Sequence, residues 1–225
     1  MARARQPLSR DRVLQTAMRL ADENGIESLT MRKLARELGV EAMSLYNHVA
    51  SKGDLVDAIV DLVIEEIELP SPGGDWRAEI RTCALSAHQA YLRHSWACRL
   101  AIGPTATRGL RETRLRYMEW LLGLLRTADF SADLTYHAYH VLDGYILGFT
   151  MWQLGHGAAA NAVAEDDEDF DFESIVAKLI PEMRERGYPY IAEHAEQHFD
   201  PPLAVIANGF EFGLEMILDG LERVR

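Results

Sequence analysis

The chain has 225 residues, of which 48% are hydrophobic, so it can bury a core, and this composition excludes an intrinsically disordered protein. Its two cysteines, Cys83 and Cys98, form no CxxC motif, which excludes a disulfide scaffold and a cysteine-based zinc site. No apolar stretch reaches the roughly 18 residues that a membrane-spanning helix needs, and the basic start of the chain lacks the apolar segment of a secretory signal. We therefore expect a cytoplasmic protein of one or two domains.

Charge is distributed unevenly along the chain, whose formal net charge is −12. Residues 1–52 contain nine Lys and Arg against six Asp and Glu, a net charge of +3, whereas the remaining residues contain 14 against 29, a net charge of −15. A basic segment on an acidic protein indicates a small nucleic-acid-binding module. Because +3 over 52 residues is a modest excess, chance is the alternative interpretation.

Helical periodicity predicts four helices before the clearest break in the chain, at residues 70–74. Serine and threonine cap helix N-termini, and glycine readily takes the left-handed conformation that ends a helix. Gly25 and Gly39 are expected to end the first two helices, and the third is short and ends at His48. The expected N-termini are Ser9, Thr30, Glu41 and Ser51.

Beyond the break the sequence again predicts helices, and no segment shows the period-two alternation of a strand. The expected helices span residues 76–94, 96–102, 107–128 and 131–155. Shorter pieces follow, interrupted by Pro181 and Gly187, and a last helix begins at Pro201-Pro202 and runs to the C-terminus. The fold class is therefore all-α, with a small N-terminal bundle and a larger helical body.

The most informative segment is residues 30–48, two short helices joined by a tight turn at Gly39 within the basic part of the chain. This is the helix-turn-helix pattern, in which the first helix braces against the DNA backbone and the second enters the major groove. Ala35, Val40 and Leu45 are small or apolar where such a motif packs. An ordinary αα-hairpin uses the same glycine turn, so periodicity alone leaves both interpretations open.

The identities of these residues also resemble a known family. The relevant strings are Gly25-Ile-Glu-Ser-Leu29-Thr30, Arg32-Lys33-Leu34-Ala35, Leu38-Gly39-Val40, Leu45-Tyr46, His48-Val49, Lys52, Leu55 and Asp57-Ala58. Over about residues 9–68 the chain resembles the DNA-binding domain of the TetR (tetracycline repressor) family of transcriptional regulators. Residues 75–225 resemble, more loosely, the ligand-binding and dimerisation domain of the tetracycline-repressor-type branch. The resemblance implies a three-helix helix-turn-helix domain at 1–68, joined by a linking helix to a ligand-binding and dimerisation domain at 75–225.

The resemblance implies a DNA-binding surface on the two helices and the start of the next. In the tetracycline repressors the arginine at the position of Arg32 reaches a guanine, with a phosphate contact as the alternative role here. Ala42 and Met43 stand where those repressors carry Gln and Pro, so a different operator is expected. The polar residues are expected on phosphates, although the Tyr46 ring can instead pack under the recognition helix. The implied surface comprises Thr30, Arg32, Ala42, Met43, Ser44, Tyr46, His48 and Lys52.

The resemblance also implies a small-molecule pocket in the body, apolar with a few polar groups. Each aromatic candidate has a place in the core as its alternative role, and Arg114 is a candidate anchor for an acidic or carbonyl-bearing ligand. Ala101-Ile102-Gly103 replaces the His-Leu-Gly step in which the tetracycline repressors carry a metal-contacting His, which argues against magnesium-tetracycline as the effector. The candidate lining residues are Tyr91, Trp96, Arg114, Tyr117, Met118, Trp120, Tyr139 and Trp152.

The last predicted helix is apolar over so much of its girth that it must be buried on more than one side. In the family this helix and the one at 131–155 pair with those of a second copy in a four-helix bundle, so the resemblance implies a homodimer. A buried core within one chain is the alternative. The implied interface residues are Tyr145, Phe149, Ile206, Phe210, Leu214 and Ile217.

Two sets of side chains have spacings that a metal could use, His137 with His140 and Asp143, and His194 with His198. The first set spreads over about a third of the helix circumference, and the second lacks a third ligand. We therefore expect satisfied polar histidines, with no metal and no cofactor. No HExxH, GxSxG, Walker-type or GxGxxG motif occurs in the sequence.

The leading hypothesis is a ligand-responsive homodimeric transcriptional regulator, not an enzyme, that a small molecule releases from a palindromic operator. Most family members of this kind are repressors. One alternative is an all-helical metal-dependent enzyme that uses His137, His140 and Asp143, which metal analysis of the purified protein would reveal. The other is an architectural DNA-binding protein without a ligand, which would give a sequence-tolerant footprint and no ligand-induced melting shift.

Overall fold

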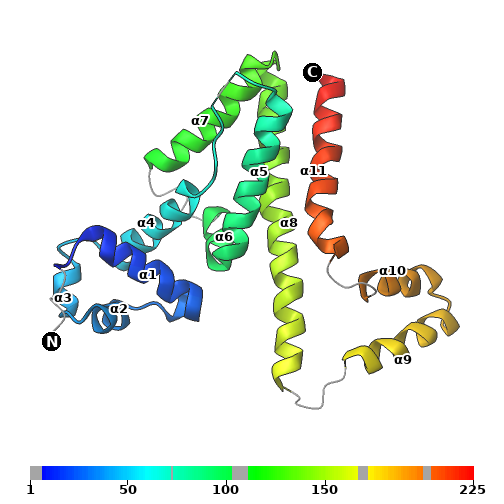
Figure 1. The fold of residues 1–225 in the computed structure, drawn as a ribbon, viewed down its shortest axis with the longest axis horizontal. Helices are drawn as coiled ribbons and strands as arrows, with labels where there is room; N and C mark the ends of the chain where they lie inside the picture. The colour runs from blue at the N-terminus through cyan, green and yellow to red at the C-terminus, as the bar shows by residue number, and fades with distance from the viewer. Residues whose placement is uncertain (1–6, 72, 103–110, 167–171, 200–203) are drawn as a thin grey trace. The chain divides into compact units, whose positions relative to one another are not determined.

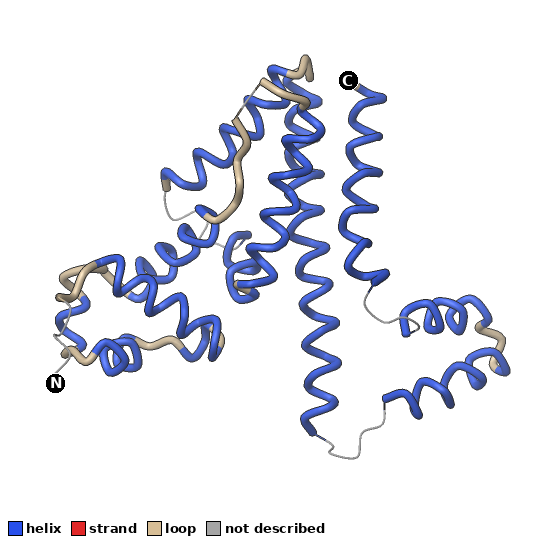
Figure 2. Tube along the Cα trace, viewed as in Figure 1, coloured by secondary structure: helices blue, strands red, loops and turns tan. Residues whose placement is uncertain are grey.

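A computed structural model describes residues 7–71, 73–102, 111–166, 172–199 and 204–225. Within these ranges the regular elements are eleven α-helices and one short 3-10 helix, and no strand occurs among them (Figures 1 and 2). The predicted all-α class is confirmed. Among the described helices, none is long and apolar enough to cross a membrane.

The chain divides into two compact units, residues 1–150 with Arg225 and residues 151–224, and the division lies within α8. We call residues 7–68, which contain α1 to α4, the head. In chain order the helices are α1 (Arg10–Asn24), the 3-10 helix η1 (Ile26–Ser28), α2 (Met31–Leu38), α3 (Ala42–Leu45), α4 (Lys52–Glu65), α5 (Trp76–Arg93), α6 (Ser95–Ile102), α7 (Glu112–Thr127), α8 (Ala132–Asp166), α9 (Phe172–Glu185), α10 (Pro189–Phe199) and α11 (Ala204–Val224).

Side-chain caps begin three helices of the head where the sequence predicted them. In each case the backbone N–H three residues further on donates to the capping hydroxyl, which satisfies a donor that the helix leaves free. The distances are 3.2, 3.1 and 3.0 Å for Ser9, Thr30 and Ser51. At α4 the Asp54 carboxylate also accepts the N–H of Ala50, the residue before the cap, at 3.0 Å, so a second backbone donor at this helix end is satisfied.

Leucines from successive elements form the core of the head. Leu34 of α2, Leu45 of α3 and Leu55 of α4 have no exposed surface, and neither does Leu29 before α2. In the structure α1 packs on both α2 and α4, and α2 packs on α3. Four fully buried leucines represent several kcal/mol of burial, since each contributes about 1.5–3 kcal/mol. The short helices α2 and α3 are therefore held in place by tertiary packing, not by their own length.

The same unit continues with α5, α6, α7 and the first part of α8. Its core is aromatic at one end, where the rings of Trp76 and Phe130 meet edge to face with centroids 5.1 Å apart. Leu125 and Leu142 are fully buried as well. Because α5 packs on α4, α6 and α7, the head and these helices share one packed unit.

A row of carboxylates on α4 faces basic side chains at the start of α7, where Arg111 is the N-cap residue. Asp61, which is 8% exposed, pairs with the Nε of Arg111 and lies 3.3 Å from the Nε of Arg114. Arg111 also reaches Asp54 at 3.6 Å. Removing one partner of such a part-buried pair costs more than the pair itself contributes, because a charge is left without compensation. We call these residues the α4–α7 charge row.

In the second unit the structure departs from the sequence prediction at two helices. α8 continues past Gly155 to Asp166, through an alanine-rich stretch that favours helix. Pro181 was predicted to interrupt the helix, but it lies inside α9. A proline removes one backbone donor, and the residues on both sides of it remain helical here. The turn at Gly187 is confirmed, with φ 84°. Pro201-Pro202 lies outside the described residues, and α11 begins at Ala204.

Candidate DNA-binding surface and effector site

The helix-turn-helix consists of α2, a turn at Gly39 and α3. Gly39 has φ 68° and ψ 36°, in the left-handed region where a side chain would cause strain. Leu34 and Leu45 are buried on either side of this turn, so α3 is fixed against α2. The recognition helix is shorter than predicted, since it ends at Leu45 and the chain reaches His48 through turns.

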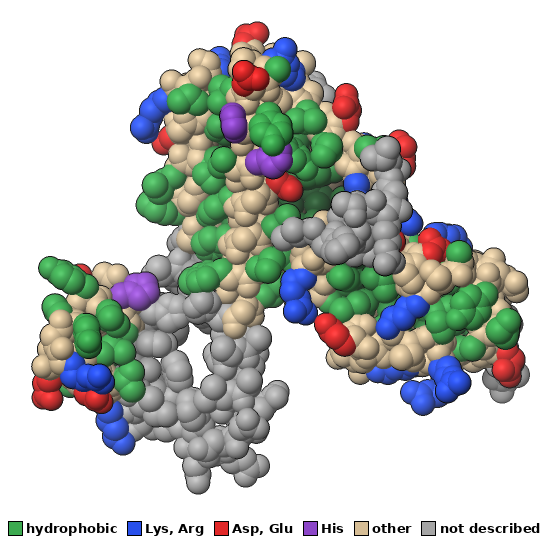
Figure 3. Space-filling view, turned by 180° about the vertical axis from the view of Figure 1, so that it is seen from behind, with side chains coloured by type: hydrophobic (Ala, Val, Ile, Leu, Met, Phe, Trp, Pro, Cys, Tyr) green, Lys and Arg blue, Asp and Glu red, His purple; other side chains and the backbone are tan. Residues whose placement is uncertain are grey.

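The basic residues of the predicted DNA-binding surface are exposed and keep their charge available. Neither Arg32 nor Lys52 makes a hydrogen bond or ion pair with a described residue. In contrast, Arg19 on α1, which is not among the predicted DNA-binding residues, is paired with Glu23 at 2.8 Å and with Glu37 at 2.5 Å. Lys and Arg side chains lie over the head, the lobe at the lower right of Figure 3. Unpaired cations on this surface favour binding to a polyanion.

The other predicted DNA-binding residues lie around them on α3 and at the ends of α2 and α4. Met43 is 76% exposed and Tyr46 is 46% exposed, which is unusual for side chains of this size. The exposure of Tyr46 does not favour the alternative in which its ring packs under the recognition helix. Thr30 is exposed and its hydroxyl already caps α2. The half-buried members are Ala42, Ser44 and His48.

In the same unit, polar side chains from α5, α7 and α8 lie near a half-buried carboxylate, that of Asp143. The hydroxyl of Tyr117 donates to Oδ1 of Asp143 at 3.3 Å. Burial raises the pKa of Tyr91, Tyr139 and Cys83, and the negative charge of Asp143 raises it further, so these groups lie near that carboxylate. We call these five residues the Asp143 cluster.

The Asp143 cluster provides hydrogen-bond donors in a poorly hydrated place. Burial raises the pKa of Tyr139 and of Cys83 to about 12 and raises that of Tyr117 well above its ordinary value, so all three are neutral near pH 7. Burial also raises the pKa of Asp143, while the hydrogen bond from Tyr117 and the charge of His140 oppose this. Buried groups with displaced pKa values are typical of binding sites.

Asp143→Asn should stabilise the fold by about 0.5–2 kcal/mol near pH 7, because it removes a carboxylate that burial disfavours. As pH rises, the unfolded chain ionises first, so the native protein loses relative stability up to the raised pKa of Asp143. The gain in unfolding free energy should therefore be greatest near pH 7 and shrink towards pH 4. Urea denaturation of both proteins at several pH values measures it. A variant that is less stable at neutral pH would contradict this account of Asp143.

Other predicted pocket residues use their polar groups in contacts between helices. The indole N–H of Trp96 donates to Asp22 of α1 at 2.7 Å, and that of Trp120 donates to the carbonyl oxygen of Pro70 at 2.8 Å. Arg114 belongs to the α4–α7 charge row. Trp96 and Trp120 are thus held by groups outside the cluster, whereas the charge of Arg114 lowers the pKa of Tyr91, so Arg114 lies near that tyrosine. Met118 and Trp152 are 39% and 46% exposed.

On α11 the predicted interface residues are divided between a buried and an exposed face. Phe210 and Leu214 are 1% and 0% exposed within a single chain, so the core of one chain accounts for their burial. Phe212 and Met216, which were not among the predicted interface residues, are 69% and 61% exposed. They are four residues apart and therefore share one side of the helix. Ile217 is half-buried.

The remaining predicted interface residues lie on α8 and at the start of α11. Tyr145 and Phe149 are half-buried and their rings are 5.7 Å apart, so each is partly covered by the other. The side chain of Ile206 lies outside the described residues.

Of the histidines considered as metal ligands, His137 and His140 both contact the ring of Tyr136. His137 and His140 are exposed, and Nδ1 of His140 is 2.8 Å from the carbonyl oxygen of Tyr136. Asp143 instead belongs to the cluster described above. The side chain of His198, the partner considered for His194, lies outside the described residues. Among the residues that the structure describes, no group of three His, Cys, Asp or Glu could hold a metal ion.

The sequence interpretation missed one polar site, centred on His94. This residue ends α5 and is 7% exposed, between Asp22 of α1 and Glu66 at the end of α4. Its partners are 72 and 28 residues away in the chain, so no local periodicity could identify them. The only signal was a histidine beside a predicted helix end.

A basic, exposed helix-turn-helix on a helical body with a buried polar cluster defines a DNA-binding transcriptional regulator. Comparisons with known proteins agree with this class. Residues 13–59 match the family described as bacterial regulatory proteins, tetR family, and residues 69–225 match the tetracyclin repressor-like, C-terminal domain. The chain belongs to the TetR family, and it is a ligand-responsive transcriptional repressor and not an enzyme.

Several relatives resemble the chain over most of its length. The HTH-type transcriptional repressor DrrR1 of Streptomyces coeruleorubidus is 34% identical, over 96% of this chain and 77% of its own. The class D tetracycline repressor protein of Escherichia coli is 30% identical, over 94% of this chain and 93% of its own. The crystal structure of Streptomyces coelicolor ActR in complex with actinorhodin has a TM-score of 0.69 and 26% identity, covering 97% of this chain and 98% of that one. Members of the family bind operator DNA and small-molecule effectors.

Proposed function

We propose that two copies of this chain bind a palindromic operator through residues 1–68, which contain the head, and that residues 75–225 bind the effector and hold the dimer together. The observation that carries the proposal is a pair of exposed cations without partners among the described residues, Arg32 on α2 and Lys52 at the start of α4, together with the exposed Met43 of α3. Such a motif places the start of its second helix in the major groove.

Each residue of the surface has a distinct proposed role. Arg32 would read a guanine through its O6 and N7 atoms, and Met43 and Ala42 would meet thymine methyl groups. Lys52 lies in the first turn of α4, where free backbone N–H groups add to its attraction for a phosphate. Thr30, Ser44, Tyr46 and His48 supply polar atoms for phosphates or base edges.

Selection from random DNA duplexes tests the operator hypothesis. A two-fold dimer should enrich an inverted repeat whose half-sites are centred about 34–36 Å apart, or a multiple of that distance. Footprinting of the selected duplex then checks protection of both half-sites. Enrichment of a single half-site, or of no sequence, would contradict a palindromic operator.

The effector is proposed to bind at the Asp143 cluster. The cluster combines the apolar faces and hydroxyl groups of Tyr91, Tyr117 and Tyr139 with one carboxylate, which fits a small aromatic molecule that carries hydrogen-bonding groups. The relative ActR was crystallised with actinorhodin, so a protein of this fold accepts a small organic ligand. Binding would favour a head arrangement that fits the operator poorly, and so release repression.

Coupling between the two sites makes a measurable prediction. A library of aromatic metabolites is screened by thermal shift, and the strongest hit is titrated into the protein with and without the selected operator. Operator should weaken the binding of that compound by about 5- to 150-fold, because a coupling of 1–3 kcal/mol acts equally in both directions. Equal affinity in the two titrations would show that the compound is not an effector, however tightly it binds.

A further inference from the structure

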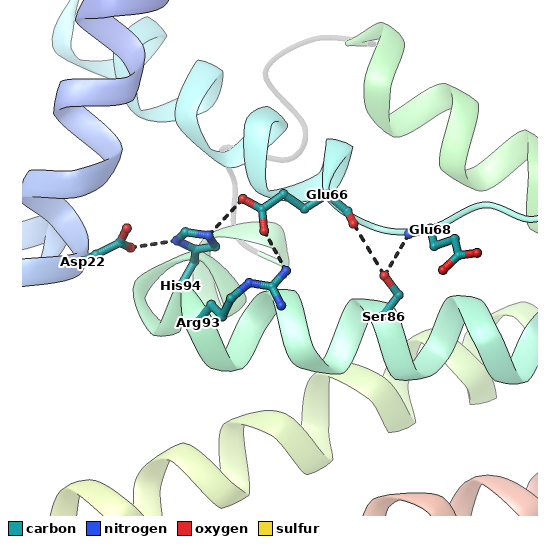
Figure 4. Close-up of polar contacts among 6 residues, drawn as sticks. All are labelled: Asp22, Glu66, Glu68, Ser86, Arg93 and His94. Atoms are coloured by element: carbon teal, nitrogen blue, oxygen red, sulfur yellow. Dashed lines mark hydrogen bonds and ion pairs between the residues drawn. The ribbon is translucent and has the colours of Figure 1, made fainter.

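His94 connects the head to the helices that follow it. Its Nδ1 is 2.8 Å from Oδ1 of Asp22 on α1, and its Nε2 is 3.1 Å from Oε1 of Glu66 at the end of α4 (Figure 4). The side chain of His94 is 9% exposed, while those of Asp22 and Glu66 are 29% and 32% exposed. One part-buried imidazole therefore contacts carboxylates from two helices of the head.

This arrangement fits only one charge state of the imidazole. A neutral histidine carries a single N–H, so one of its nitrogens would direct a lone pair at a carboxylate oxygen. The imidazolium donates from both nitrogens and satisfies both contacts. When the proton is lost, one of the two contacts becomes repulsive.

The neighbouring groups strengthen the bridge. The indole N–H of Trp96 on α6 donates to the same Asp22 oxygen at 2.7 Å, and Arg93 on α5 donates to the second Glu66 oxygen at 2.7 Å. Burial alone would raise the pKa of Glu66, but Arg93 and His94 together lower it below its ordinary value. Glu66 is therefore held in the ionised form that the imidazolium needs.

The backbone that follows α4 is also bound to α5, the helix that carries Arg93. The Ser86 hydroxyl on α5 accepts the N–H of Glu68 at 2.9 Å and lies 3.5 Å from the carbonyl oxygen of Glu66 (Figure 4). The other end of α4 begins next to the recognition helix, at the Ser51 cap. The helix α4 therefore connects the Glu66 contact to Lys52 of the proposed DNA-binding surface.

We propose that His94 is a positioning residue which, when protonated, locks the head in its operator-binding arrangement, so that operator affinity falls as the imidazolium loses its proton. The inference rests on the proposed operator binding by the head. A head that is already oriented loses less freedom when it binds, and an unlocked head loses more. The exposed ion pair between Arg99 on α6 and Glu27 on η1, at 3.3 Å, adds little to this lock because both side chains are well solvated.

The test is the pH dependence of operator binding by the full-length protein. His48 lies on the proposed DNA-binding surface, so all proteins carry His48→Gln to remove its contribution. Fluorescence anisotropy with the selected operator, at constant ionic strength, should show affinity falling about fivefold or more from about pH 6 to about pH 8. Adding His94→Gln should give weak binding with a much flatter profile, whereas adding His137→Gln, an exposed histidine on α8, should leave the profile unchanged.

Two further variants separate positioning from a general loss of structure. His94→Lys keeps a cation that does not titrate in this range, so it should restore affinity at about pH 8 relative to His94→Gln. Asp22→Asn removes one contact and leaves the histidine in place, and it should also flatten the profile. A His94→Gln protein with the profile of its parent, or a His94→Lys protein as weak as His94→Gln at about pH 8, would overturn the proposal. If the parent itself selects no operator, the proposed function fails instead, which is a different result.

Discussion

Phe212→Asp should convert the protein to a folded monomer that binds the operator at least about 100-fold more weakly. Phe212 and Met216 form an exposed apolar pair on α11, and a carboxylate placed there would be desolvated in a contact with a second copy. Two joined heads bind more tightly than one by about 10²–10⁴-fold, so separation of the copies removes that gain. Sedimentation velocity and anisotropy with the selected duplex measure the two effects.

Matched variants at neighbouring positions show whether the effect belongs to an interface. Phe212→Leu keeps an apolar contact and should remain a dimer. Phe210→Asp should instead unfold the protein, because Phe210 is 1% exposed within one chain and its burial needs no partner. An intact dimer of the Phe212→Asp variant with full operator affinity would place the interface elsewhere.

Arg32→Ala should cost about 1–3 kcal/mol at the selected operator and relax the preference at one base pair. The reason is that Arg32 is exposed, has no partner among the described residues and stands in the first turn of the brace helix α2. Anisotropy with operators substituted at each position identifies the affected base pair.

Lys52→Ala is the matched control for Arg32→Ala, since it removes one exposed cation with a proposed phosphate contact. It should weaken binding to all sequences alike and reduce the slope of log affinity against log salt by about one. If Arg32→Ala also weakens every sequence equally, Arg32 contacts a phosphate and reads no base.

Local signals in the head were strong enough to predict it from sequence. The caps at Ser9, Thr30 and Ser51 and the left-handed Gly39 are each set by residues within a few positions of one another. α8 was predicted too short because Gly155 was expected to end it, while the helix-favouring residues that follow prevailed.

Contacts between distant parts of the chain could not be predicted. Trp96 and Trp120 appeared equivalent to the other aromatic residues, yet their partners lie 74 and 50 residues away, in α1 and before α5. Asp143 was considered because of its spacing from two histidines, whereas the structure gives it a tyrosine from α7. Spacing along one helix reveals which face a side chain occupies and leaves open which helix covers that face.

The α4–α7 charge row bears on attempts to build hybrid regulators by exchanging heads between relatives. A donor head inserted at residues 1–68 would bring its own residues to the positions of Asp54 and Asp61, opposite the unchanged Arg111 and Arg114. If the donor lacks acidic residues there, two part-buried guanidinium groups lose their counter-charges. The hybrid will then be unstable even when each part is stable in its own parent protein. Complementary charges in the α4–α7 charge row, as much as the recognition helix, therefore decide which operator specificities can be transferred to residues 75–225.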